Sequence, residues 1–254
     1  MARRVPEGPP PPPVVQRLRL RYAKRGRLRF TSHRDFARAF ERALRRAEIP
    51  MAYSAGFSPH PKISYVGAAP TGVASEAEYL EIGLARELDP DTVRAELDRV
   101  LPDGLDIDEA VVAGPGSLPE RMHASVWRIE LPGIDELTAR AALDAFLARE
   151  EIGVERVLKS GRRMLDVRTP VLRAEVTGAA PDGTGVIRAI MTLVVRQVTP
   201  TVRPDDVVVA LRDVAGLAPA GPPIAVRLAQ GPLDEGGAVG DPLAADRNSA
   251  PTLS

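Results

Sequence analysis

The segment from Tyr53 to Lys62, YSAGFSPHPK, holds the side chains of this sequence best suited to chemistry. It combines aromatic rings, an imidazole, serine hydroxyls and an ammonium group with Gly56 and two prolines, Pro59 and Pro61. Prolines stiffen a backbone and glycine frees it, so we expect a loop of defined shape. Bases of single-stranded RNA stack on such rings while cations contact the phosphates. The alternative is a purely structural loop, in which the aromatic side chains of Tyr53 and Phe57 fill the core.

The residues before this loop predict a helix with arginines on one side. Ser32 is a suitable N-cap, and Asp35 follows at the spacing of a capping box. Apolar residues recur at helical steps from Phe36 to Ala47, which indicates one buried stripe. Arginines follow the same period on another side: Arg34, Arg38, Arg42 and Arg45, with Arg46 beside them. Like charges at this spacing repel each other by about 0.2–0.5 kcal/mol per pair, and a partner phosphate would relieve that repulsion.

Positive charge is concentrated in this part of the chain, although the formal net charge is zero. Between Arg17 and Lys62 there are thirteen lysine or arginine residues and only three acidic ones. Such a cluster favours a surface for nucleic acid or an acidic partner. A solvated face is the alternative, because nearly all the basic residues are arginine, which is typical of GC-rich coding. Codon bias does not explain the clustering, however.

Composition excludes several classes of protein. The chain has no cysteine, which rules out disulfides, cysteine zinc sites, a thiol nucleophile and a cysteine-bound iron–sulfur cluster. No apolar run approaches the length of a membrane-spanning helix, and the N-terminus lacks the apolar stretch of a signal peptide, so we expect a cytoplasmic protein without membrane contact. Nucleotide-binding glycine motifs and a nucleophile elbow are also missing.

Hydrophobic patterning predicts an α+β fold of two tandem ferredoxin-like (βαββαβ) halves between two disordered tails. We expect a Pro-rich tail over 1–15, a first half over 16–114, a second half over 122–230 and a Gly/Pro-rich tail over 231–254. In the first half, a strand over 17–22 is expected to pair with a hairpin strand over 27–30. The other elements of this half are the arginine-bearing helix, strands over 63–66 and 78–84, a helix over 89–101 and a strand over 106–112.

The second half follows the same order more loosely. We expect a strand over 125–131 and a helix over 135–149, then a hairpin of strands over 154–158 and 164–167. A long strand over 186–196, a helix over 203–214 and a strand over 224–229 complete it. No residue identity between the halves supports this repetition, which is a matter of pattern alone.

The stretch from Phe30 to Ile82 resembles the radical-SAM-linked, or radical-SAM-associated, protein family. The family pattern has a Ser-His-x-Asp start, an arginine-rich helix, a Pro-x-x-Tyr-Ser-x-Gly-Phe-x-Pro-His-Pro-Lys loop and a Ser-x-x-Glu-Tyr segment. The matching positions here are Ser32, His33, Asp35, Arg45, Arg46, Pro50, Tyr53, Ser54, Gly56, Phe57, Pro59, His60, Pro61, Lys62, Ser75, Glu78 and Tyr79.

This resemblance implies a cobalamin-dependent radical-SAM partner that carries the cluster and the cobalamin, while this chain holds no cofactor. We therefore expect a non-catalytic accessory protein that binds RNA or presents a substrate. The expected contact residues are His33, Arg34, Arg38, Arg42, Arg45, Arg46, Tyr53, Ser54, Phe57, His60 and Lys62.

Three alternatives remain open. In a metal-independent RNA endonuclease, His33 would act as general base, with Lys62 or Arg34 stabilising the charge of the transition state. In a metal protein, imidazoles and carboxylates would supply the ligands, and the candidates are His33, Asp35, His60, Glu76 and Glu78. In a protein-docking module, the basic face would meet an acidic partner.

Overall fold

The computed structural model describes residues 12–158 and 161–248, which form two compact units. The first unit contains the residues up to Glu120 together with those from Pro242 onward, and the second runs from Arg121 to Asp241. Most of the expected N-terminal tail lies outside the described residues. In the part that is described, no helix is long and apolar enough to cross a membrane.

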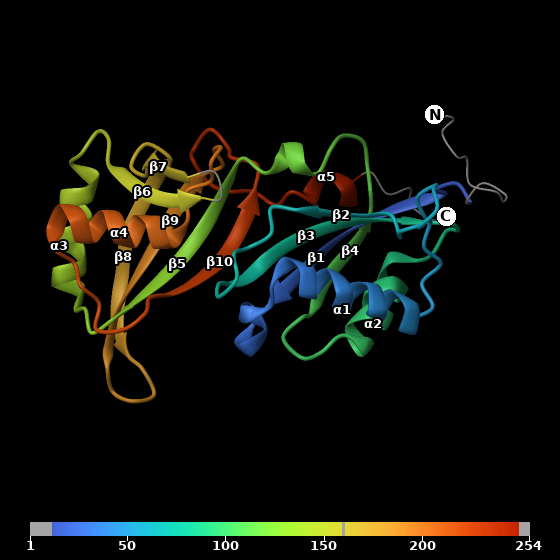
Figure 1. Cartoon of the computed structure of the whole chain (residues 1–254), viewed down its shortest axis with the longest axis horizontal. Helices are drawn as coiled ribbons and strands as arrows, with labels where there is room; N and C mark the ends of the chain where they lie inside the picture. Colours follow the sequence, from blue (N-terminus) through green and yellow to red (C-terminus); the bar gives the residue numbers. More distant parts are fainter. Residues whose placement is uncertain (1–11, 159–160, 249–254) are drawn as a thin grey trace. The chain divides into compact units, whose positions relative to one another are not determined.

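The first unit is a four-stranded antiparallel sheet with two α-helices on one face (Figure 1). Its strands lie in the order β4-β1-β3-β2. Its elements, in chain order, are β1 (Gln16–Lys24), η1 (Gly26–Phe30), α1 (His33–Arg46), β2 (Ile63–Val66), β3 (Ala74–Leu84), α2 (Pro90–Val100) and β4 (Ile107–Val112).

Local signals explain both helices of this unit. Ser32 caps α1 by accepting a hydrogen bond from the backbone N–H of Asp35, and Asp89 caps α2 in the same way through Thr92. Phe40 of α1 and Leu97 of α2 are fully buried against Leu20 of β1. Because side chains alternate along a strand, the arginines of β1 lie on the opposite face of the sheet.

The segment 27–30 does not form the predicted hairpin strand. It is part of η1, a 3₁₀ helix in which Leu28 N–H donates to Arg25 C=O and Thr31 N–H donates to Leu28 C=O. Strand β1 is paired on both sides, with β3 and with β4. A returning strand therefore has no edge of β1 on which to pair.

The second unit has a four-stranded antiparallel sheet in the order β10-β5-β9-β8, and a separate two-stranded sheet of β6 and β7. Its elements are η2 (Pro119–Arg121, at the boundary), β5 (Ala124–Pro132), α3 (Glu136–Leu147), β6 (Gly153–Leu158), β7 (Gly161–Asp166), β8 (Val171–Pro181), β9 (Ile187–Arg196), α4 (Pro204–Ala215) and β10 (Ile224–Gly231). Each unit thus combines helices with antiparallel strands, so the chain has a mixed α/β fold. Strand β8 was not predicted from the sequence.

Residues 231–248 are ordered, which corrects the prediction of a disordered tail over 231–254 as far as the chain is described. The short helix α5 (Ala244–Arg247) belongs to the first unit. Asp246 is 1% exposed and accepts hydrogen bonds from Arg19 Nη1 at 2.7 Å and from Gly114 N–H at 2.9 Å. Leu243 is fully buried as well. A buried ion pair and a buried leucine hold this segment against the first unit.

Candidate nucleic-acid interface

Helix α1 presents an exposed arginine face on the side away from the core. We use this name for Arg34, Arg38, Arg42, Arg45 and Arg46, all of which are exposed. None of them forms an ion pair with any residue that the structure describes. The last two lie in the final turn, where cations interact favourably with the helix dipole. The other three have no such structural role and are available to a partner.

The remaining basic residues of the predicted cluster are largely neutralised. On β1, Arg17 pairs with Glu81 at 3.0 Å, and Arg19 pairs with Asp246. Arg25 binds Glu76, and this contact raises the pKa of the Arg25 guanidinium above its ordinary value. The predicted basic patch therefore contains paired arginines on and next to β1, whereas the arginine face of α1 forms no ion pair with a described residue. The same holds for Arg27, Arg29 and Lys62.

Lys24 is buried rather than available at the surface. Its ammonium group donates to the carbonyl groups of Ala69 and Pro70, at 3.4 and 3.2 Å.

The hallmark loop, residues 53–62, has a fixed conformation. Ser54 N–H donates to His60 C=O at 2.9 Å, and His60 N–H donates back to Ser54 Oγ at 3.0 Å. At the base of the loop, Lys62 N–H donates to Ala52 C=O, and Gly83 N–H near the end of β3 donates to Lys62 C=O. Ser54 therefore helps to shape the loop, and its predicted contact with RNA stays a prediction.

The tip of this loop is exposed. Phe57 is 70% exposed, and Tyr53, His60 and Lys62 also lie at the surface. The alternative in which Phe57 fills the core is wrong. Gly56 has φ +134°, a conformation that side-chain-bearing residues rarely adopt, and it allows the turn that carries Phe57 outward. The loop follows the C-terminal end of α1 in the same unit (Figure 1).

A second exposed aromatic precedes α1, and sequence reasoning missed it. Phe30 is 59% exposed, and the guanidinium of Arg29 lies over its ring at 4.7 Å from the centroid. The sequence predicts a hairpin strand over 27–30 and no binding role for this ring. Exposed aromatic rings thus flank α1 in the sequence, Phe30 before it and Phe57 after it.

His33 lies at the surface, in the first turn of α1, with one ring contact. Its imidazole meets the ring of Tyr65 edge-on, with 4.9 Å between the centroids. Tyr65 also packs against Phe36, which stacks on Tyr22 in the core. Among the described residues, His33 has no hydrogen-bonded carboxylate that would orient the imidazole. The endonuclease role predicted for His33 therefore lacks the orienting group usual for a general base.

The Tyr65 hydroxyl is buried without a hydrogen-bond partner in the described part of the chain. Burial, with the negative charge of Glu41 second, raises the pKa of the Tyr65 phenol above its ordinary range. An unpaired buried hydroxyl loses its hydration without compensation, which destabilises the folded state.

Tyr65→Phe should therefore raise the free energy of unfolding, by about 1–2 kcal/mol. The measurement is chemical denaturation of both forms, with Tyr53→Phe, which changes a surface ring, as a control expected to be near neutral. A loss of stability in Tyr65→Phe would mean that the hydroxyl has a partner after all.

The residues proposed as metal ligands are not brought together. Asp35 accepts from Ser32 Oγ at 2.6 Å, Glu76 pairs with Arg25, and Glu78 is buried and accepts from Ala69 N–H at 2.9 Å. Within the described residues, no group of three or more histidine, cysteine, aspartate or glutamate side chains could hold a metal ion. The other hallmark residues have structural positions: Tyr79 is buried in β3, and Pro61 forms an isolated bridge with Tyr53.

Together these features define a two-unit chain of antiparallel sheets. Its first unit carries a cationic helix face without ion pairs among the described residues, followed in the chain by a hydrogen-bonded loop with an exposed aromatic ring. The chain belongs to the family described as "Uncharacterized protein conserved in bacteria" (DUF2344), whose sequence model matches residues 17–204. The match includes all of the arginine face and the hallmark loop. No curated protein matches the sequence. The family description names neither RNA nor a radical-SAM protein, so both stay predictions.

Proposed function

We propose that the chain is a non-catalytic accessory protein that binds RNA and presents it to a cobalamin-dependent radical-SAM partner. The observation that carries this proposal is the arginine face of α1, which is exposed and has no ion pair among the described residues. Elsewhere in the unit, arginines on β1 are matched with carboxylates. A row of unmatched like charges on one helix is unfavourable without an anionic partner.

The spacing of these arginines suits a phosphate backbone. Arg34, Arg38 and Arg42 are four residues apart, so each step advances about 6 Å along the helix axis. Guanidinium groups bind phosphates through charge-assisted and often bidentate hydrogen bonds. A strand that follows this row can therefore place successive phosphates against successive arginines.

The hallmark loop supplies the second element of an RNA surface. Phe57 is held outward on a loop closed by two hydrogen bonds, so its ring is ordered before any ligand binds. Aromatic rings of this kind stack on bases, with a contribution of about 1–3 kcal/mol per base.

The radical-SAM partnership rests on the sequence resemblance alone. A chain without cysteine cannot supply the thiolates that hold an iron–sulfur cluster, so the proposed partner must carry it. We also propose that both units are ferredoxin-like. The strand orders β4-β1-β3-β2 and β10-β5-β9-β8 support this, if β6 and β7 are an insertion after α3.

Phe57→Ala tests the proposal, because it removes a ring that the fold does not need. We expect RNA affinity to fall by roughly 5- to 150-fold, the equivalent of one lost stacked base. The measurement is fluorescence anisotropy with a labelled single-stranded RNA at low salt. Phe57→Tyr should keep most of the affinity, and thermal melting should show all three proteins to be folded. If Phe57→Ala and the parent protein bind RNA with equal affinity, the ring of Phe57 does not contact RNA and the loop is not part of the interface.

The same RNA, examined for integrity by gel electrophoresis, tests the endonuclease alternative. The accessory role predicts intact RNA in the presence of the chain alone. Cleavage that His33→Ala abolishes would instead support catalysis by His33.

A further inference from the structure

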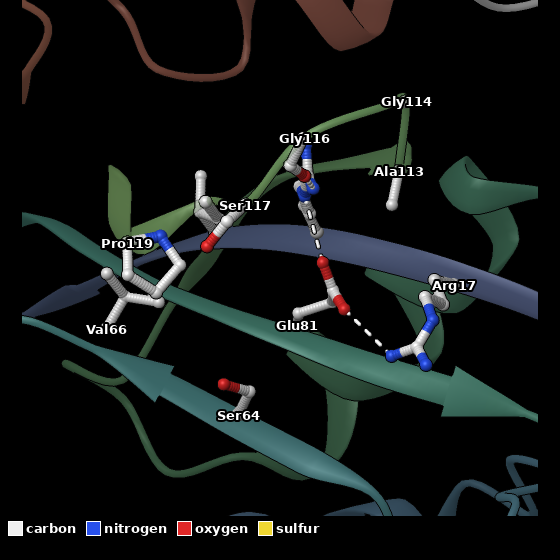
Figure 2. Close-up of a pocket in the computed structure, with 11 residues that line it drawn as sticks. Arg17, Ser64, Val66, Glu81, Ala113, Gly114, Gly116, Ser117 and Pro119 are labelled. Atoms are coloured by element: carbon white, nitrogen blue, oxygen red, sulfur yellow. Dashed lines mark hydrogen bonds and ion pairs between the residues drawn. The ribbon is translucent and has the colours of Figure 1, made fainter. Parts of the chain in front are cut away.

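The face of the first unit's sheet opposite α1 and α2 holds a pocket of about 340 Å³ (Figure 2). Three strands form its floor, and the segment 113–119 after β4 forms its wall. The lining residues are Arg17, Arg19, Ser64, Val66, Glu81, Ala113, Gly114, Gly116, Ser117, Leu118 and Pro119. This volume falls at the lower end of the range of small-ligand sites, about 300–1,000 Å³.

The floor of the pocket is a polar row across adjacent strands. The strand register aligns Arg19 of β1 with Glu81 of β3, and Glu81 with Ser64 of β2. Arg19 is 2% exposed and fully engaged, since it donates to Glu81, Asp246 and the Gly116 carbonyl. Its hydrogen bonds fix both the Glu81 carboxylate and the wall segment in place.

Arg17 is less constrained. It donates a single hydrogen bond, from Nη1 to Glu81 at 3.0 Å, and its side chain is 55% exposed. Its other guanidinium donors have no partner among the described residues. Glu81, which accepts from both arginines, holds Arg17 at the edge of the pocket (Figure 2).

Further donors without partners line the same space. The hydroxyl groups of Ser64 and Ser117 have no hydrogen bond within the described residues. The backbone N–H groups of Gly116, Ser117 and Leu118 likewise donate to no described acceptor, whereas Gly114 N–H is engaged by Asp246. Consecutive free amides in a loop provide the concave donor arrangement that binds anions. The left-handed φ of +85° at Gly116 gives this loop its sharp turn.

We propose that this pocket binds a phosphate monoester. Asp246 and Glu81 balance the charges of Arg19 and Arg17, but the groups left without a partner among the described residues are mainly donors, namely the remaining Arg17 N–H groups and the loop amides. An acceptor-rich anion therefore fits best. Arg17, Ser64, Ser117 and the adjacent amides contact the phosphate oxygens. The apolar side chains of Val66, Leu118 and Pro119 provide a wall for the group attached to the phosphate.

Two kinds of ligand carry a phosphate monoester group: a free nucleotide and an RNA strand with a 5′-phosphate end. The pocket and the arginine face of α1 lie on opposite faces of the sheet. The inference therefore does not depend on RNA binding by α1, and the two proposals fail separately.

Isothermal titration calorimetry with adenosine 5′-monophosphate and with inorganic phosphate tests the pocket. Saturable binding of the nucleotide is expected, weakened by about tenfold or more in Arg17→Gln and in Ser64→Ala, since each removes a hydrogen bond to a charged group. Arg173→Gln is the control, because Arg173 is also an exposed strand arginine with one carboxylate partner. Melting temperatures confirm that each variant is folded.

A short RNA with a 5′-phosphate or a 5′-hydroxyl end, titrated into the full chain, distinguishes the two kinds of ligand. Preference for the phosphorylated end, lost in Ser64→Ala but kept in Arg34→Ala, assigns the pocket to RNA ends. Binding of the nucleotide without that preference assigns it to free nucleotides. The proposal is overturned if neither ligand binds saturably, or if Arg17→Gln and Ser64→Ala bind as tightly as Arg173→Gln.

Discussion

Replacing Arg34, Arg38 and Arg42 together by alanine is expected to weaken RNA binding by on the order of 100-fold at low salt, because three phosphate contacts and their counterion release are lost. The slope of log K against log[salt] should also become shallower by about 2, at roughly 0.7 per phosphate for a single strand. Stability should not fall, since alanine is the best helix former and the repulsion between these arginines is removed. Fluorescence anisotropy across a salt series measures both quantities.

The matched control is the triple variant Arg99→Ala, Arg140→Ala and Arg212→Ala. These side chains are also exposed helix arginines, but each one pairs with a neighbouring carboxylate. Both triple variants lower the net charge equally, so a general electrostatic effect would weaken RNA binding in both. A comparable loss in the control would contradict a specific role for the arginine face.

Asp246→Ala is expected to destabilise the first unit by about 3–5 kcal/mol, the usual effect of removing one partner from a buried ion pair. The substitution leaves the buried Arg19 guanidinium short of one carboxylate and removes the acceptor of Gly114 N–H. Chemical denaturation gives the free energy of unfolding. Because the chain has two units, hydrogen exchange of β1 amides should show the loss in the first unit specifically.

Asp246→Asn separates the lost charge from the lost hydrogen bonds, because the amide oxygen can still accept from Arg19 or from Gly114 N–H. We therefore expect Asp246→Asn to be more stable than Asp246→Ala. If Asp246→Ala leaves the first unit unchanged, the C-terminal segment does not hold against β1 in solution.

Much of the first unit is predictable because its signals are local. The Ser32 cap and the Phe36–Phe40–Leu44 stripe predict α1, and the structure confirms a helix over His33–Arg46 with these three side chains buried. Asp89 followed by Pro90 predicts the start of α2 equally well. Strand β2 has the predicted bounds, whereas β3 begins at Ala74, four residues before its predicted start.

Features that depend on distant partners were not predictable. Strand β8 lies at an edge, and most of its side chains are exposed, so it lacks the alternating apolar pattern of a half-buried strand. The order of the C-terminal segment depends on a contact between Arg19 and Asp246, which are 227 residues apart. Composition alone made this segment resemble a tail.

In the candidate site, too, features set by local sequence were predictable, whereas those set by contacts between distant residues were not. The arginine face follows from helical spacing, but sequence cannot reveal that the arginines of β1 are paired with Glu81 and Asp246. Similarly, the composition of the hallmark loop left the position of Phe57 open between core and surface. The hydrogen bonds between Ser54 and His60 decide it, because they close the loop and leave the ring outside.

The most direct test of the central claim is the affinity of the unmodified chain for a labelled single-stranded RNA at two salt concentrations. Engagement of about five phosphates by the arginine face predicts that Kd rises roughly 100-fold between about 50 and 200 mM salt, with the RNA intact at both. Absence of binding at either concentration would contradict RNA recognition by α1 and leave docking to an acidic protein as the role of this face.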